Sequence, residues 1–255
     1  MSEERQQPES SESFRTISTR RAFMARLLAV GGAALGATAG AAMFGYKVAP
    51  VRAASDGDIV NFGNAAVGAE RIGIAFYSNA LGEASQFSNG TKDLAKGVLL
   101  NSGHRTYFMA ARNQETQHLA TLLSVPGLGF GFSVFGFPAG TFDSARAMVA
   151  FGEQLESVFI GAYLGAVQTS AAAHTSLGDT VAELAAQILG VECEHRVLIR
   201  DIAGLTPPND RFFEGDQSAT PPDTTLGNTG VRSTVYASGD AAVNALIALG
   251  ITPIS

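Results

Sequence analysis

Two Glu-x-x-His pairs constrain the fold of this chain more than any other feature. One pair is Glu115 with His118, and the other is Glu192 with His195. On an α-helix, residues three positions apart lie on one face, about 4.5 Å apart along the axis. Each pair therefore directs a carboxylate oxygen and an imidazole nitrogen to the same side. One such pair is weak evidence, but two of them predict a helical bundle with a polar centre.

Two further glutamates extend these pairs into an internal repeat. Glu70 precedes the first pair and Glu156 precedes the second, and each is followed seven residues later by a tyrosine, Tyr77 or Tyr163. Each half of the repeat is then a Glu helix followed by a Glu-x-x-His helix. Two such hairpins related by a pseudo-twofold axis would surround two metal ions with four carboxylates and two imidazoles.

The predicted metal ligands are Glu70, Glu115, His118, Glu156, Glu192 and His195. Four carboxylates in a bundle core would repel one another, and two divalent ions cancel their charge. Oxygen ligands with one imidazole per metal suit iron or manganese, and the same donors tolerate zinc. We interpret the two tyrosines as packed aromatics with satisfied hydroxyl groups; the alternative is that they hydrogen-bond a ligand or donate an electron.

Several other polar residues are interpreted as lying outside the metal site. His104 and His174 fall near helix ends and are expected at the surface, Glu194 points away from its neighbouring pair, and Glu153 is not expected to be a ligand. The single cysteine, Cys193, excludes an internal disulfide framework. Its two glutamate neighbours disfavour a thiolate, so it is a poor candidate nucleophile.

Helical periodicity predicts an all-α fold, a four-helix bundle with helices over about 58–81, 105–123, 143–170 and 176–203. Asp56 or Asp58 can cap the first helix, and Gly204 ends the fourth. The connection 124–141 is rich in both Gly and Phe. We interpret it as a long crossover packed along the bundle; the alternative is an exposed apolar patch for a partner or membrane.

The first 53 residues are typical of an export leader. Arg20 and Arg21 form a twin-arginine motif, an uncharged Gly/Ala-rich run spans 27–46, and a small-residue cleavage site precedes Ala54. The alternative is a retained membrane anchor. We therefore expect three parts: the leader at 1–53, the bundle at 54–204 and an irregular, Pro-rich extension at 205–255 with a short helix over 239–249. The folded protein is expected in the periplasm or cell envelope.

The charge of the mature chain limits its partners. Without the leader, 10 basic residues remain against 19 acidic ones, a net charge of −9. Such an acidic domain is a poor partner for nucleic acid or anionic lipid. We expect membrane contact only through the leader. The charge does not exclude assembly of the chain into a homo-oligomer.

Several short motifs resemble one bacterial family of ferritin-like domains, the family that includes desiccation-related proteins. The motifs are Asp58-Ile59-Val60-Asn61-Phe62, Ala75-Phe76-Tyr77, Leu155-Glu156-Ser157, Gly161-Ala162-Tyr163-Leu164-Gly165-Ala166 and Glu192-Cys193-Glu194-His195. The resemblance spans about 58–204 and implies a ferritin-like fold, export in many members and a dinuclear site on the six residues named above. Many members carry a second acidic residue where this chain has Gly73.

Three functions fit these expectations. The first is a dimetal oxidoreductase, of ferroxidase or manganese-catalase-like type, that handles peroxide, dioxygen or ferrous iron in stress protection. The second is a non-catalytic protective protein that uses metal to hold the bundle together. The third is an interaction module whose Phe-rich crossover and acidic tail bind another envelope protein, with a vestigial metal site.

Overall fold

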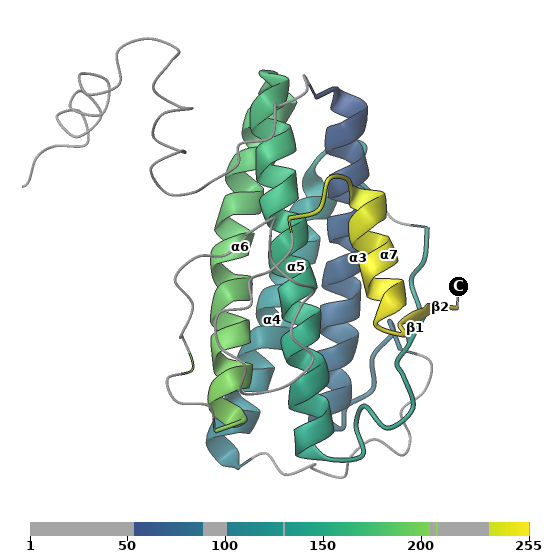
Figure 1. Ribbon diagram of the computed structural model, residues 1–255, viewed down its shortest axis with the longest axis vertical. Helices are drawn as coiled ribbons and strands as arrows, with labels where there is room; N and C mark the ends of the chain where they lie inside the picture. Colours follow the sequence, from purple (N-terminus) through teal and green to yellow (C-terminus); the bar gives the residue numbers. More distant parts are fainter. Residues whose placement is uncertain (1–53, 89–100, 130, 205–207, 209–234, 255) are drawn as a thin grey trace, which may run out of the picture. The chain divides into compact units, whose positions relative to one another are not determined.

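Five α-helices make up most of the part of the chain that the structure, a computed structural model, describes: residues 54–88, 101–129, 131–204, 208 and 235–254. They are α3 (Asp56–Leu81), α4 (Ser102–Ser124), α5 (Ala145–Ala173), α6 (Ser176–Ile202) and α7 (Gly239–Ala248). The four long helices lie side by side as a bundle (Figure 1). The all-α four-helix prediction is confirmed. The predicted leader and most of the Pro-rich part of the predicted extension, 209–234, lie outside the described residues.

Local capping sets where the helices begin. Ser55, and neither of the predicted aspartates, is the N-cap of α3: its hydroxyl accepts from the Asp58 amide, and the Asp58 carboxylate accepts from the Ser55 amide at 2.9 Å. This reciprocal capping box satisfies two amides that have no partner within the helix. Gly204, with φ of 78°, follows α6 as predicted.

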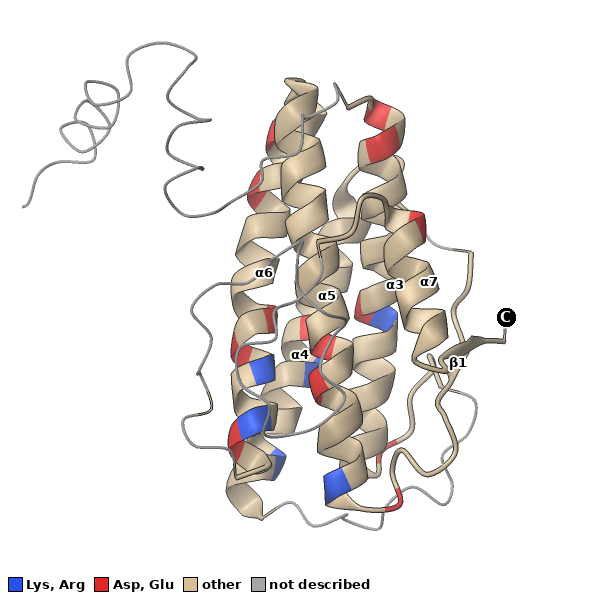
Figure 2. Ribbon diagram, in the orientation of Figure 1, with Lys and Arg blue, Asp and Glu red and all other residues tan. Residues whose placement is uncertain are grey.

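Burial differs sharply between the helices. Nearly all of α3 from Ile59 onward and most of α5 are buried, as their Ala- and Gly-rich sequences allow. Charge is sparse along both helices (Figure 2). On α4 the buried residues form one stripe at three- and four-residue steps: Phe108, Ala111, Glu115, Leu119 and Leu122. Glu115 therefore points into the bundle from the middle of an apolar face.

The crossover between α4 and α5 packs on the bundle in part. Leu128 contacts the apolar cluster around Ile59, and Phe135 is 2% exposed. Phe135 and Gly136 form the short strand β1, which pairs antiparallel with β2 (Thr252–Pro253) near the C-terminus, a pairing that the periodicity did not predict. Phe132, in contrast, is 45% exposed. Phe130 lies outside the described residues.

The helix predicted in the C-terminal extension is α7, which packs on α3 and α5. Asn61 of α3 donates to the Asp240 carboxylate at 3.0 Å and accepts from the Asp240 amide at 3.2 Å. Gly239 permits this approach because a Cβ there would collide with the Asn61 carbonyl group. Within the described residues, no helix is both long and apolar enough to span a membrane.

Candidate metal centre

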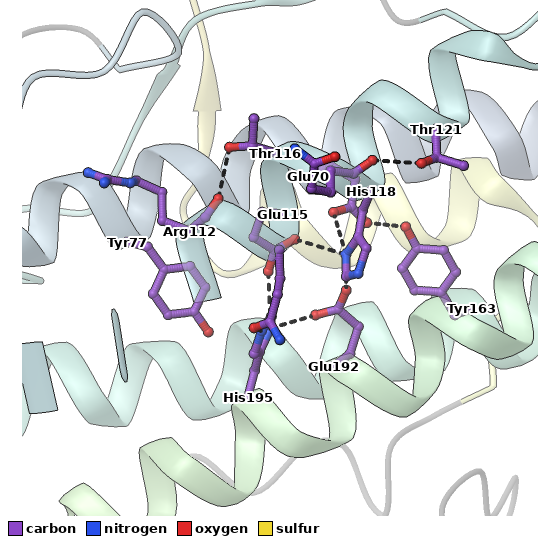
Figure 3. A network of polar contacts seen from close by, with 12 residues as sticks. Glu70, Tyr77, Arg112, Glu115, Thr116, His118, Thr121, Tyr163, Glu192 and His195 are labelled. Carbon is purple, nitrogen blue, oxygen red and sulfur yellow. Dashed lines mark hydrogen bonds and ion pairs between the residues drawn. The ribbon is translucent and has the colours of Figure 1, made fainter. Parts of the chain in front are cut away.

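The bundle brings all six sequence-predicted ligands together at its centre. Their side chains form two groups whose potential ligand atoms lie within 4.8 Å of one another: Glu70, Glu115, His118 and Glu192 in one, and Glu115, Glu156, Glu192 and His195 in the other. Figure 3 shows Glu115 and Glu192 between the two imidazoles. These two glutamates belong to both groups, whereas Glu70 and Glu156 each belong to one.

Each imidazole places its Nδ1 atom among three carboxylates. His195 Nδ1 lies 3.1 Å from Glu192, 3.2 Å from Glu115 and 3.9 Å from Glu156. One nitrogen cannot satisfy three acceptors, because a ring nitrogen carries at most one proton. The arrangement is better matched to a metal ion, which accepts several ligand atoms at once.

The second imidazole also lies among three carboxylates. His118 Nδ1 lies 3.2 Å from Glu70, 3.3 Å from Glu192 and 3.8 Å from Glu115. The two Glu-x-x-His pairs thus contribute equivalent atoms to equivalent positions. The pseudo-symmetry expected from the sequence repeat is present in the site.

Carboxylate oxygens without hydrogen-bond partners show that the residues fit a bound cation. All four glutamates are 0% exposed. Among the described residues, both Glu115 oxygens, Glu156 Oε2 and Glu192 Oε1 have no hydrogen-bond partner, although some lie at ion-pair distance from an imidazole. Burying such groups without partners is costly. Two divalent cations would satisfy these atoms and balance the four carboxylate charges.

Two tyrosines support the outer glutamates, Glu70 and Glu156, across the bundle. The Tyr77 hydroxyl of α3 donates to Glu156 of α5, and the Tyr163 hydroxyl of α5 donates to Glu70 of α3. Each tyrosine thus reaches the glutamate of the other hairpin. Burial and the adjacent carboxylates raise the pKa of both phenols well above 10.0, so they remain hydrogen-bond donors. The structure agrees with the hydrogen-bonding alternative for these residues.

Gly73 of α3 makes room for one of the shared glutamates. A Cβ on Gly73 would lie 2.8 Å from Glu115 Cδ and 3.1 Å from each of its oxygens. The Glu115 carboxylate therefore occupies the space that a side chain at position 73 would fill. In the sequence, Gly73 is only a departure from the family pattern. Its role in making room for Glu115 follows from the packing of α4 against α3.

We predict that Gly73→Ala weakens metal binding while the fold persists. Alanine favours a helix over glycine by about 1 kcal/mol, and the clash falls on the end of a flexible side chain. The cost is therefore a displaced Glu115 carboxylate. Elemental analysis after reconstitution should show fewer ions per chain. Gly57→Ala, on the same helix, is the matched control, because a Cβ there meets nothing closer than 3.5 Å; metal content equal in the two variants would contradict the prediction.

The remaining polar residues lie where they do not join the cluster. Glu194 and His174 are exposed, and His104 is half-buried beside Asn101. Glu153 is buried and pairs with Arg196 and, at 3.2 Å, with Arg200. This ion cluster, beside the candidate metal centre on α5 and α6, was missed from the sequence because Glu153 and the arginines are far apart along the chain.

Protonation of the metal-free cluster follows from its crowding. Burial alone lowers a histidine pKa, but the carboxylates around His118 raise its pKa to about 12, and Glu192 with its neighbours raises that of His195 to about 9. Burial and neighbouring carboxylates raise the pKa of Glu115 well above 4.5. Burial opposes ionisation of Glu192, yet the two imidazoles beside it lower its pKa to about 2.

We predict that the metal-free protein loses stability as the pH rises from about 6.5 to 9. A histidine that keeps its proton in the fold stabilises the fold fully below its unfolded pKa, and that contribution declines as the pH approaches the folded pKa. The raised pKa of Glu115 acts in the same direction. Added metal should reverse the trend because binding displaces these protons. Thermal unfolding of metal-free and metal-loaded protein across this range tests this; higher stability of the metal-free form at pH 8.5 than at pH 6.5 would contradict it.

Comparison with known proteins gives one match. A family model described as a ferritin-like domain matches residues 55–205, which is more than half of the chain and includes all six clustered residues. No curated protein matches the chain, and no solved structure matches it. The matched region ends before α7, so the family model does not account for the C-terminal helix.

Proposed function

This chain belongs to the ferritin-like domain family, and from that premise we propose that it is an exported dimetal-carboxylate protein that handles peroxide, dioxygen or ferrous iron in stress protection. The observation that carries the proposal is the pair of four-donor groups sharing Glu115 and Glu192. Iron or manganese fits the donors best. The predicted twin-arginine leader supports export. That route carries folded proteins, often with their cofactor in place, which suits a metal-binding domain.

The residues have distinct parts in this proposal. Glu115 and Glu192 would help to hold both ions, while Glu70 and Glu156 would each help to hold one. Tyr77 and Tyr163 hold the outer glutamates in place through their hydroxyl groups. Bound iron or manganese would supply redox chemistry with peroxide or dioxygen. In a ferroxidase reaction, ferrous iron would itself be the substrate that is oxidised.

The surroundings of the site favour small substrates. The side chain of His118 is 12% exposed, while that of His195 is 1% exposed and the glutamates are 0% exposed. Packed side chains from α3 and α5 exclude bulk water from most of the cluster. Peroxide, dioxygen and ferrous iron are small enough for such a site, whereas a large organic substrate is not.

Purified protein, reconstituted separately with Fe(II) and Mn(II), tests the proposal. We expect about two ions per chain, together with peroxide consumption or oxidation of ferrous iron above the rate of free metal. Two ions with neither activity would favour the non-catalytic alternative, in which metal only stabilises the bundle. Absence of binding by the folded protein would overturn the dimetal proposal.

A further inference from the structure

The two positions of the candidate metal centre differ in their access to solvent. Every donor residue of the group containing His195 is buried, and the His195 side chain is 1% exposed. The group containing His118 has one half-buried member, His118 itself, with a side chain that is 12% exposed. Water and small solutes therefore reach one position more easily than the other.

A hydrogen bond from outside the cluster also distinguishes the two imidazoles. His195 Nε2 lies 2.9 Å from the side-chain oxygen of Gln114. When Nδ1 binds a metal, Nε2 must carry the ring proton, and the Gln114 oxygen can accept it. Such a bond fixes both the tautomer and the orientation of the ring before metal arrives.

The sequence repeat is broken at the position that provides this support. Gln114 directly precedes Glu115, so its counterpart in the second Glu-x-x-His pair is the residue before Glu192. That residue is Val191, which has no side-chain oxygen. Position 191 of α6 therefore cannot hold the His118 ring in the way that Gln114 of α4 holds the His195 ring.

We propose that the two positions bind metal unequally: the position at His195 fills first and keeps its ion, and the position at His118 fills second and exchanges with solvent. The inference rests on the proposed dimetal function. Its physical basis is preorganisation, since a ring already held in the binding orientation loses less freedom when the ion arrives. Gln114 is a positioning residue that acts through His195.

Titration of the metal-free full chain with Mn(II) tests this inference, with free Mn(II) followed by electron paramagnetic resonance. We expect two binding steps with dissociation constants that differ at least tenfold. Gln114→Leu should weaken the tighter step about 10- to 100-fold, the usual effect of removing such a support. Gln114→Glu, which retains an oxygen acceptor, should keep two separate steps. Gln117→Leu, at an exposed position on the same helix, should behave as the wild type.

A second measurement reports on the rings themselves. In protein loaded with Co(II), proton NMR resolves the shifted imidazole N–H signals. We expect one signal to persist after transfer to deuterated water and to disappear in Gln114→Leu. The other signal, from His118, should exchange quickly in both proteins. A purely structural role for Gln114 would not remove a single N–H signal in this way.

The outcomes separate this inference from the proposed function. Two equal binding steps, or two N–H signals that exchange alike, would overturn the unequal positions and leave a dimetal site in place. A tight step unchanged in Gln114→Leu would overturn the role of Gln114. No Mn(II) binding by the folded wild type would overturn the proposed function and this inference together.

Discussion

Replacing Glu115 with alanine is expected to remove both metal ions, whereas replacing Glu70 with alanine should remove one. Glu115 offers oxygens to both four-donor groups, and Glu70 offers them to one. The two residues are equally buried, because both are 0% exposed. Elemental analysis of the reconstituted variants should give near zero ions per chain for Glu115→Ala and about one for Glu70→Ala.

Stability of the metal-free variants provides the control for this comparison. Burial and then the neighbouring carboxylates raise the pKa of Glu115 well above 4.5, so removing this side chain relieves crowding in the metal-free cluster. We therefore expect metal-free Glu115→Ala to remain folded by circular dichroism, so that loss of metal reports loss of a ligand. One ion retained at full occupancy in folded Glu115→Ala would show that this glutamate does not serve both positions.

Replacing Glu153 with alanine should destabilise the fold by about 3–5 kcal/mol, the usual cost of breaking a buried ion pair from one side. Arg196 and Arg200, which both contact this carboxylate, are 3% and 2% exposed and would keep their charges inside the protein. For a domain of this size the loss corresponds to a melting temperature lower by roughly 6–20 °C.

The same variant tests whether Glu153 serves only the ion cluster with the two arginines or also binds metal. Glu153 belongs to neither four-donor group, so reconstituted Glu153→Ala should retain about two ions per chain at a temperature where it is folded. Arg146→Ala, at an exposed position on the same helix, is the matched control and should change stability by less than about 0.5 kcal/mol. A Glu153→Ala protein of normal stability that lacks metal would contradict this assignment.

Much of the bundle was predictable because its helices are determined locally. The four predicted helices match α3 to α6 to within about three residues at each end, since apolar spacing and caps act over single turns. The sequence predicts an aspartate as the N-cap of α3, whereas the structure has Ser55 there. Serine and aspartate side chains both accept from the first amides of a helix, so the sequence does not distinguish them. The β1–β2 pair was missed because it joins two short segments far apart in the chain.

The sequence by itself determined which residues line the centre. A Glu-x-x-His spacing places both side chains on one face of any helix, and apolar neighbours turn that face inward. Helix packing alone decided how these residues are shared: Glu115 and Glu192 face both imidazoles, and each tyrosine supports the opposite hairpin. Gly73 and Gln114 acquire their roles only from neighbouring helices. The physical reason is the range over which each effect acts. Periodicity fixes the direction in which a side chain leaves its own helix, but the distances between helices depend on every side chain packed between them.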